Sequence, residues 1–529
     1  MKIAPVVAGA SLLLGACSIL YNPNNIGDGP ADAAVDDKPA DMRIDEMVDA
    51  PVDAMIDDMP VDMMIDAPQL PIAIGDVEPA FLVEGTGMGG SRAALLVLDV
   101  ENFSGVDTAF TVSQIDDNGA LQTVTIVETR VSTDKTKVGL ALQIPVLVST
   151  PQGMTRTFDV TISQMGSSAM KTITVNGLDE LIVADTTVNT NTPLRPLYSQ
   201  VRLTNAHFAG ANPALIRSAS DIVITGSVDV DGVGSTPGAH GCAGGAAATA
   251  GGCNPGGGGG GASNGLGNGA PGGGGGFGAN GSAGGSGGGA AGVATGSEWL
   301  ATLITGTGAA GNRGNGGGGG GNGLLSAAGG VGGGGGGVLE LTANGSLTVM
   351  AGGFASARGG NGSAGSGDGG GGSGGAIVVR AGGGISAPAG WIRAAGGTGA
   401  GAGATKAGDG SGGRIRVDSS TTADVDPMVQ GLVPKRGANW LAGAPLMTGT
   451  AAQTIMLVGA VGQAYGINLN NVALADATIG ATNTIGVDVT LALTGASNDS
   501  PFNTLCAINP TANLGNLESV RCIQVLYLP

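Results

Sequence analysis

Three short apolar segments recur in this chain at a fixed interval of 38 residues. They begin at Val338, Ala376 and Arg414, and each follows a pair of glycines. A strand-sized segment that returns at a constant period is typical of solenoids, in which every repeat stacks on its neighbour. The spacing therefore predicts a glycine-rich, parallel β-helix-like solenoid over residues 200–420.

Glycine fills the intervals between these segments. Of the 105 glycines among 529 residues, 77 lie between positions 232 and 413, with unbroken runs at 256–261, 316–321 and 332–337. The runs exclude a collagen triple helix, because they break any strict Gly-X-Y period. Disordered runs would be flexible, solvated loops. Ordering each glycine costs about 0.5–1 kcal/mol more than ordering alanine, which packed polyglycine helices would have to offset by dense backbone hydrogen bonding. We expect these polyglycine excursions to be ordered, because strands return in register after each one.

Shorter segments complete the expected repeat. Residues 222–232 alternate like an opening strand with its turn, and residues 346–350 and 391–394 have the character of second strands that lead into glycines. The solenoid is thus expected to carry its glycine-rich excursions on one side.

The regions on either side of the solenoid have ordinary composition and also favour strands. Residues 70–185 contain alternating runs at 94–100, 123–127, 138–148, 157–163 and 170–175, with turn signals at Asn118-Gly119 and Asn176-Gly177. This pattern predicts a small antiparallel β-sandwich, and it resembles IPT/TIG or immunoglobulin-like modules. Residues 425–529, with expected strands at 454–458, 487–493 and 523–528, are predicted to form a second sandwich-like domain that caps the solenoid. The whole fold is expected to be all-β.

The N-terminus has the order of a bacterial export signal. Lys2 precedes an apolar stretch at 6–14, and Leu14-Gly15-Ala16-Cys17 follows. This order resembles the lipobox of bacterial lipoproteins, which implies that residues 1–16 are a signal peptide and that Cys17 is lipidated. The apolar stretch is shorter than the about 20 residues of a membrane span, so the lipid would be the anchor. A buried cysteine in a short hydrophobic helix is the alternative.

An acidic segment follows the lipidation motif. Residues 21–68 hold thirteen Asp and Glu residues against Lys38 and Arg43, in a repeated pattern of a hydrophobic residue followed by aspartate. A helix is disfavoured because like charges four residues apart repel each other, and because Pro51 and Pro60 interrupt it. We expect residues 17–68 to be a charged, disordered tether. Calcium binding is the alternative, although the spacing is not that of an EF-hand.

The four remaining cysteines fall into two local pairs. An exported protein meets an oxidising compartment, so we expect disulfides between Cys242 and Cys253 and between Cys506 and Cys522. A zinc site formed by all four cysteines is the alternative, but no C-x2-C spacing supports it.

The sequence offers little material for catalysis. Asp229 and Asp231 alternate with valines and are expected to face one side of a strand, either as a solvated face or as an acid–base pair acting on polysaccharide. His207 and His240 are isolated, and Asp368 and Asp409 lack the hydrophobic residue that calcium-binding nonapeptide repeats require. We therefore expect no catalytic residues, metal or cofactor. A net charge of −19 also opposes nucleic-acid binding.

The order of lipobox, acidic tether, sandwich, glycine-rich solenoid and terminal β domain resembles surface lipoproteins of the myxobacterial type. That resemblance implies a non-enzymatic, structural or adhesive lipoprotein of the cell envelope. It would be held in the outer membrane by its lipid, exposed at the surface or facing the periplasm, with polysaccharide or surface proteins as partners. The alternative is a polysaccharide-binding or polysaccharide-cleaving β-helix. Sugar platforms need clustered aromatic residues, whereas Trp299, Trp391 and Trp440 are scattered in the sequence.

Overall fold

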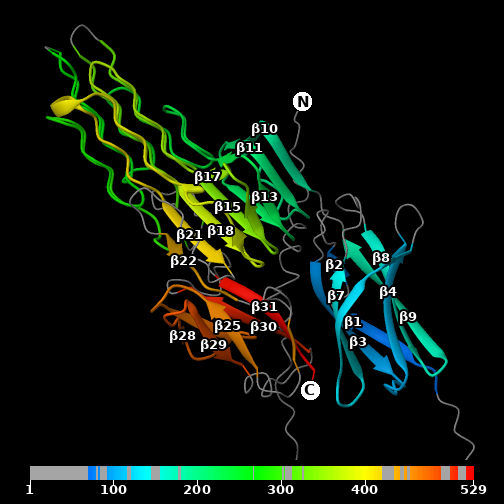
Figure 1. Ribbon diagram of the computed structural model, residues 1–529. Coiled ribbons are helices and arrows are strands. Elements are labelled where there is room, and N and C mark those ends of the chain that lie inside the picture. The colour runs from blue at the N-terminus through cyan, green and yellow to red at the C-terminus, as the bar shows by residue number, and fades with distance from the viewer. Residues whose placement is uncertain are drawn as a thin grey trace, which may run out of the picture.

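The computed structural model describes residues 70–78, 81–83, 92–115, 121–144, 155–176, 180–265, 267–300, 303, 312–323, 327–419, 434–440, 446–448, 453–489, 501–509 and 520–528. Within these ranges the fold is all-β, with an N-terminal sandwich, a parallel solenoid bearing glycine-rich excursions and a C-terminal β domain (Figure 1). No helix in these ranges is long and apolar enough to span a bilayer. Cys17 and the tether at 17–68 lie outside the described residues.

Two sheets form the N-terminal sandwich. The first has the order β1 (Ala73–Glu78), β3 (Arg92–Glu101), β7 (Lys137–Ile144), β6 (Thr125–Val131). The second has the order β2 (Phe81–Val83), β9 (Ser167–Asn176), β8 (Thr155–Gln164), β4 (Thr108–Ile115), β5 (Leu121–Thr123). Every second side chain faces the partner sheet, so that Leu96, Leu98, Leu140 and Phe158 are buried between them. The strands expected at 94–100, 157–163 and 170–175 are confirmed, and the strand expected at 138–148 is confirmed as far as Ile144, beyond which residues 145–148 are not described. The segment expected as a single strand at 123–127 instead joins the end of β5 to the start of β6, which belong to different sheets.

The solenoid consists of two parallel sheets that face each other. One contains β12 (Ala214–Ser218), β15 (Val338–Ala343), β18 (Ala376–Ala381), β21 (Arg414–Ser419) and β22 (Lys435–Arg436) in that order. The other stacks two short strands per turn: β13 (Ile222–Ile224), β16 (Leu347–Val349), β19 (Ile385–Ser386), and then β14 (Ser227–Asp229), β17 (Phe354–Ser356), β20 (Ile392–Arg393). Both stacks meet at β11 (Val201–Ala209), which pairs on its other edge with β10 (Leu181–Asn189).

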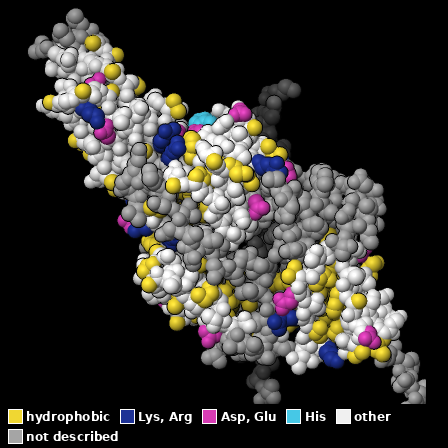
Figure 2. All heavy atoms as spheres, viewed as in Figure 1, with side chains coloured by type: hydrophobic (Ala, Val, Ile, Leu, Met, Phe, Trp, Pro, Cys, Tyr) yellow, Lys and Arg dark blue, Asp and Glu magenta, His cyan; other side chains and the backbone are white. Residues whose placement is uncertain are grey.

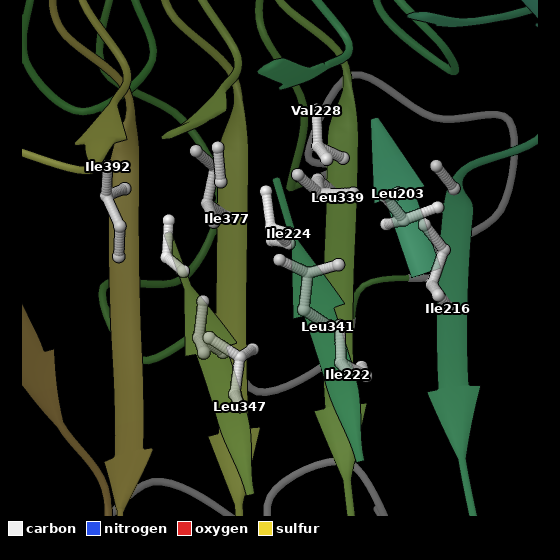
Figure 3. Close-up of a cluster of buried hydrophobic side chains, with 14 of the residues drawn as sticks. Leu203, Ile216, Ile222, Ile224, Val228, Leu339, Leu341, Leu347, Ile377 and Ile392 are labelled. Carbon is white, nitrogen blue, oxygen red and sulfur yellow. The ribbon is translucent and has the colours of Figure 1, made fainter. Parts of the chain in front are cut away.

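The 38-residue period sets the register of the first sheet. Val338 lies opposite Ala376, and Ala376 lies opposite Arg414. One residue further on, Leu339, Ile377 and Ile415 form an inward-facing column that packs against the second sheet. Figure 3 shows Leu339 and Ile377 with aliphatic side chains of the second sheet, such as Ile224, in the space between the two sheets.

The structure differs from the sequence expectation in two respects. The solenoid sheets begin at Leu181 and end at Arg436, because β10 pairs in parallel with β11 and β22 pairs with β21. In addition, the segments expected at 346–350 and 391–394 are not equivalent. The first contains β16, which stacks on β19, and the second contains β20, which stacks on β17. Glycine-rich turns make the two short strands of each repeat difficult to distinguish from their spacing.

The excursions between 232 and 413 form what we call the glycine bundle, a set of extended segments that project beyond the strands (Figure 1). In segment 367–375, every third residue donates its N–H to the same neighbour. Gly367, Gly370 and Ser373 bond to segment 314–323, and Gly369, Gly372 and Gly375 bond to segment 357–363. Three residues per turn without internal hydrogen bonds is the geometry of the polyproline II helix.

Segment 367–375 is surrounded on all sides. Two further N–H groups of the segment, those of Gly371 and Gly374, donate to the carbonyl oxygens of Gly408 and Ser411. Its carbonyls accept from three further segments, through residues such as Gly333, Gly275 and Gly397. The segment has no hydrogen bonds within itself. Its N–H groups instead donate to three neighbouring segments, and its carbonyl oxygens accept from three others.

Glycine is required at these interior positions because of close backbone approach. A Cβ atom on Gly370 would overlap the carbonyl oxygen of Gly273, whereas one on Gly371 or Gly372 would overlap carbonyl oxygens of two other neighbours. Consecutive residues of a three-fold helix face three directions, so no rotation of the segment would make room for side chains at Gly370, Gly371 and Gly372 together. A helix at the periphery of the bundle has one side that faces solvent, and side chains can occupy that side. In segment 357–363 and just beyond it, the exposed residues Arg358, Asn361 and Ala364 stand at every third position.

The C-terminal domain contains two further sheets. One has the order β23 (Asn439–Trp440), β25 (Thr454–Val458), β29 (Thr484–Asp488). The other has the order β24 (Leu446–Thr448), β31 (Val520–Tyr527), β30 (Phe502–Ile508), β26 (Ala464–Leu469), β27 (Val472–Ala473), and β28 (Ala477–Thr478) also pairs with β26. Trp440 and Tyr465 are among its buried core residues. The strands expected at 454–458 and 523–528 correspond to β25 and β31. The strand expected at 487–493 begins earlier, at Thr484, since it corresponds to β29, which ends at Asp488, and residues 490–493 lie outside the described residues.

A buried ion network lies on the outer side of the sheet that contains β15. The Glu340 carboxylate is fully buried and accepts hydrogen bonds from Arg217 Nε and Nη2 at 2.8 and 2.9 Å. Arg380 bridges Glu340 and Asp418 at 3.5 Å to each, and Arg521 of the C-terminal domain lies 3.6 Å from Asp418. Charged groups thus connect three turns of the solenoid with the C-terminal domain.

The network holds its carboxylates ionised. Burial alone would raise the pKa of Glu340, but the charges of Arg380 and Arg217 and their hydrogen bonds outweigh it and hold that pKa at about 2. The pKa of Asp418 is lowered in the same way, with Arg416 as its main partner. Removing one member of such a network leaves an uncompensated buried charge.

We predict that Gly370→Ala destabilises the protein by about 1–3 kcal/mol, as overpacking does in a close-packed interior. Gly265→Ala is the matched control, because a Cβ there has open space around it. Thermal unfolding measures both variants, and amide hydrogen exchange over 256–337 reports whether the bundle has loosened. Equal unfolding temperatures for the two variants would contradict the packing described above.

We predict that Glu340→Gln lowers the free energy of unfolding by about 3–5 kcal/mol at neutral pH. The pKa of Glu340 is lower in the folded than in the unfolded protein, so its contribution is complete above about pH 4.5 and is lost as the pH falls toward 2. Denaturant unfolding between pH 7 and pH 2 should therefore show a shallower acid decline in the variant than in the wild type. Parallel declines would show that Glu340 does not titrate as described.

Candidate functional site

Polar side chains form a row across the outward side of the second solenoid sheet. His207 lies opposite Asp229, Asp229 opposite Ser356, and Ser356 opposite Arg393. The residues preceding them, Ala206, Val228, Ala355 and Ile392, are buried in the solenoid core. Because side chains alternate along a strand, the row of His207, Asp229, Ser356 and Arg393 faces away from the core, and we call it the polar row.

His207 and Asp229 form an ion pair at one end of the row. His207 Nδ1 lies 2.5 Å from Asp229 Oδ1, with side-chain exposures of 32% and 20%. The hydrogen bond to Asp229 raises the pKa of His207 above its usual 6.5, against an opposing effect of burial, and the charges of Asp229 and Asp231 add to the increase. The imidazole is therefore more readily protonated than a free histidine.

Asp231, two residues further along, is held by the next turn of the solenoid. Its Oδ1 accepts hydrogen bonds from Ser356 Oγ and the Arg358 N–H, both at 2.6 Å. Its Oδ2 lies 2.7 Å from Arg358 Nη2. Asp231 thereby fastens the exit of β14 to the start of the following excursion.

The two aspartates face one side of the strand, as the sequence predicts. The structure adds that each has a basic partner, His207 for Asp229 and Arg358 for Asp231. Charged hydrogen bonds between these partners tie neighbouring turns together. The row offers a ligand charge and hydrogen-bonding groups. Figure 2 shows histidine and acidic side chains close to one another on the surface of the solenoid.

Arg393 ends the row beside an aromatic ring. Its guanidinium carbon lies 3.8 Å from the centroid of the Phe354 ring, a cation–π contact between β20 and β17.

The tryptophans are not part of this surface. Trp391 and Trp440 are each 1% exposed, and Trp299 is 9% exposed. Trp391 packs into the solenoid core and Trp440 into the core of the C-terminal domain. Their indole faces are therefore occupied by protein contacts.

The aspartates of the glycine bundle take part in local contacts. Asp409 binds Lys406 Nζ at 2.7 Å and accepts the Gly399 N–H at 2.8 Å, and Asp368 accepts the Gly365 N–H at 3.3 Å. In the part of the chain that the structure describes, no three His, Cys, Asp or Glu side chains gather as a metal site would require.

The four cysteines lie at disulfide distance in the two local pairs. The Cα atoms of Cys242 and Cys253 are 5.9 Å apart in the first excursion, and those of Cys506 and Cys522 are 4.1 Å apart on β30 and β31. Cys17, the expected lipidation site, lies outside the described residues.

His240 lies apart from the polar row, in a recess where the solenoid meets the glycine bundle. The recess has a volume of about 330 Å³ and is lined by Gly210, Thr236, Pro237 and Arg313, among other residues. His240 Nδ1 lies 2.9 Å from the Ala211 carbonyl oxygen. Burial lowers the pKa of His240, and the charge of Arg313 lowers it further, so the ring is neutral near pH 7.

Sequence reasoning did not find the partners of these residues. Arg358 lies 127 positions from Asp231, and Asp229 lies 22 positions from His207. Extending the 38-residue register to the short strands of each turn would have aligned Ser356 with Ala394, one residue beyond its observed partner Arg393. The first excursion is far longer than the later ones. Asp229 is therefore 127 positions from Ser356, and the period of the repeat does not align the two residues.

No protein-family model matches this chain, and no curated protein matches it.

We predict that Asp229→Asn lowers the pKa of His207 toward 6.5, because the principal hydrogen-bond partner of the charged imidazole is lost. A raised histidine pKa stabilises the fold below pH 6.5, and this contribution disappears as the pH rises through the folded pKa, so the variant should lose stability mainly at acidic pH. NMR titration of the ring C–H resonances measures the change. Asp231→Asn serves as the comparison and should lower the pKa less, since Asp231 acts on His207 through charge alone. An unchanged pKa in Asp229→Asn would contradict the assignment.

Proposed function

We propose that this protein is a non-enzymatic lipoprotein of the bacterial cell envelope, structural or adhesive in role. In this proposal Cys17 carries the lipid in the outer membrane, and the acidic tether at 17–68 separates the membrane from the folded domains. The solenoid and glycine bundle then present a stiff β-rich surface to partners outside the membrane.

The observation that supports the proposal is the hydrogen-bonded packing of the glycine bundle. Segment 367–375 uses its backbone donors and acceptors on six neighbouring segments, which resists bending as well as local unfolding. Such a projection has small, mostly uncharged side chains on its outside, as at Asn361 and Ala364. A stiff projection with few charged or reactive side chains suits a spacer or an adhesive surface.

The polar row supports a structural role for the charged groups of the solenoid. Asp229 and Asp231 are both hydrogen-bonded to basic side chains from neighbouring strands or turns, His207 and Arg358. In a glycosidase one carboxyl of the pair must pass a proton to the leaving group and the other must attack or activate water. Ion pairing across the turns is the arrangement expected of groups that hold the solenoid together.

The anchor is tested with Cys17→Ala. We predict that the variant moves from the membrane fraction to the soluble fraction or accumulates unprocessed, because no thiol is present to accept the lipid. Ser18→Ala is the matched control and should remain in the membrane fraction. A Cys17→Ala protein that stays membrane-bound at the wild-type size would refute lipid anchoring.

The adhesive role is tested on whole cells that lack the protein. Adhesion to glycan-coated and protein-coated surfaces should fall on deletion and return with the wild-type chain, but not with Cys17→Ala. Full restoration by the released Cys17→Ala protein would show that presentation at the membrane is unnecessary.

A further inference from the structure

The recess around His240 combines features that the polar row lacks. It is concave, and its volume of about 330 Å³ falls at the lower end of the range of about 300–1,000 Å³ typical of small-molecule sites. Its wall includes Ala209, Ala211 and Pro237, and its polar groups come from Thr236, His240 and Arg313. An apolar wall with a few convergent polar groups is the usual composition of a binding site for a small ligand.

The histidine is held in an unusual conformation. His240 has a φ of 61°, in the left-handed region that glycine normally supplies, although it is flanked by Gly241 and by a segment rich in glycine. Non-glycine residues in this region carry strain and occur preferentially at ligand sites. The conformation is fixed by two contacts: the His240 N–H donates to Gly210 O, and Nδ1 lies 2.9 Å from Ala211 O.

These contacts define what the imidazole can offer. A carbonyl oxygen at Nδ1 requires that Nδ1 carries the proton, so in the neutral ring Nε2 is a hydrogen-bond acceptor. An acceptor nitrogen binds a hydroxyl group and disfavours a fully ionised oxyanion. Arg313, in the same recess, supplies the positive charge and the planar donors that suit a carboxylate.

We propose that this recess binds an acidic saccharide, in which Arg313 pairs with the carboxylate of a uronic acid unit and His240 Nε2 accepts a hydrogen bond from one of its hydroxyl groups. The Thr236 hydroxyl provides a second polar contact, and Pro237 with the two alanines packs against the C–H face of the ring. The proposal concerns a small-ligand site and does not rest on the adhesive role given above.

The chain contains only two histidines, which makes the test specific. In the full-length protein, the ring C–H resonances of His240 should shift on titration with sodium glucuronate, while those of His207 should not, and His240→Gln assigns the signal. Glucose, which lacks the carboxylate, and acetate, which lacks the hydroxyls, should each produce a markedly smaller shift. Equal shifts with glucuronate and glucose, or with glucuronate and acetate, would overturn the assignment.

Variants identify the residues. Arg313→Gln should weaken glucuronate binding by about tenfold, the equivalent of one charge-assisted contact. Arg130→Gln removes the same charge from the N-terminal sandwich, where Arg130 pairs with Glu128, and should leave the affinity unchanged. If the His207 resonances of both variants match those of the wild type, the fold is intact. The absence of a His240 shift in Arg313→Gln then means that glucuronate binding is lost. Equal affinities of the two variants, or the absence of any His240 shift in the wild type, would refute the site.

A short oligouronate distinguishes the two sources of this ligand. A recess for a residue within a polymer should bind it at least as tightly as glucuronate, whereas a recess for a free sugar acid should bind it more weakly. Failure of the oligouronate and glucuronate together would overturn the proposal.

Discussion

The exclusion of Cβ atoms from the interior of the glycine bundle is the constraint on which the rest of the structure depends. Backbone segments approach so closely that a methyl group at Gly370 would overlap a neighbouring carbonyl oxygen. The same closeness lets the N–H and C=O groups of one segment, such as those of Gly370, form hydrogen bonds with adjacent segments. The hydrogen bonds that offset the entropy of ordering glycine are therefore available only because glycine is present.

The bundle and the solenoid stabilise each other. Each excursion leaves one sheet after β14, β17 or β20 and returns to the other sheet at β15, β18 or β21. The aliphatic columns between the sheets fix the ends of the excursions in register, and the segments between them pack as a lattice. On the opposite side of β15 and β18 the buried ion network joins the final turns to the C-terminal domain through Arg521 and Asp418. Hydrophobic packing, backbone hydrogen bonding and ion pairing thus act on different faces of the same strands.

Much of this architecture could be predicted from the sequence. The period of the segments at Val338, Ala376 and Arg414 gives the parallel sheet and its register, because one strand per repeat must stack on the next. The glycine content indicates where the bundle lies in the sequence. Segments in which two glycines precede a larger residue, as at Asn361 and Thr398, are the helices that have one side facing solvent. The ends of the solenoid were harder to place, since β10 and β22 have no glycine-rich excursion to identify them.

The partners of charged residues could not be predicted. Glu340 and Arg380 interrupt apolar strands, and their positions in the sequence are those of ordinary outward-facing residues. Only the tertiary fold shows that the two side chains are buried next to each other. The recess around His240 is likewise assembled from the end of β11, the turn at Thr236 and the start of segment 314–323. Contacts of this kind depend on how far each excursion projects in space before it returns to the solenoid. No local sequence pattern predicts that distance.

The unequal lengths of the excursions have a consequence for the order of folding. The later turns pair Val338 with Ala376 and Ala376 with Arg414, but the first turn pairs Ala214 with Leu339 across the whole of the longest excursion. Closing that loop costs more chain entropy, and contacts between distant residues form slowly. During synthesis from the N-terminus, the sandwich can fold early, whereas β12 cannot pair with β15 until β15 has been synthesised. The newly made protein therefore passes through a stage in which an unpaired strand edge is exposed beside a long stretch of unstructured glycine, and its yield in the cell is expected to depend on how quickly that stage is completed.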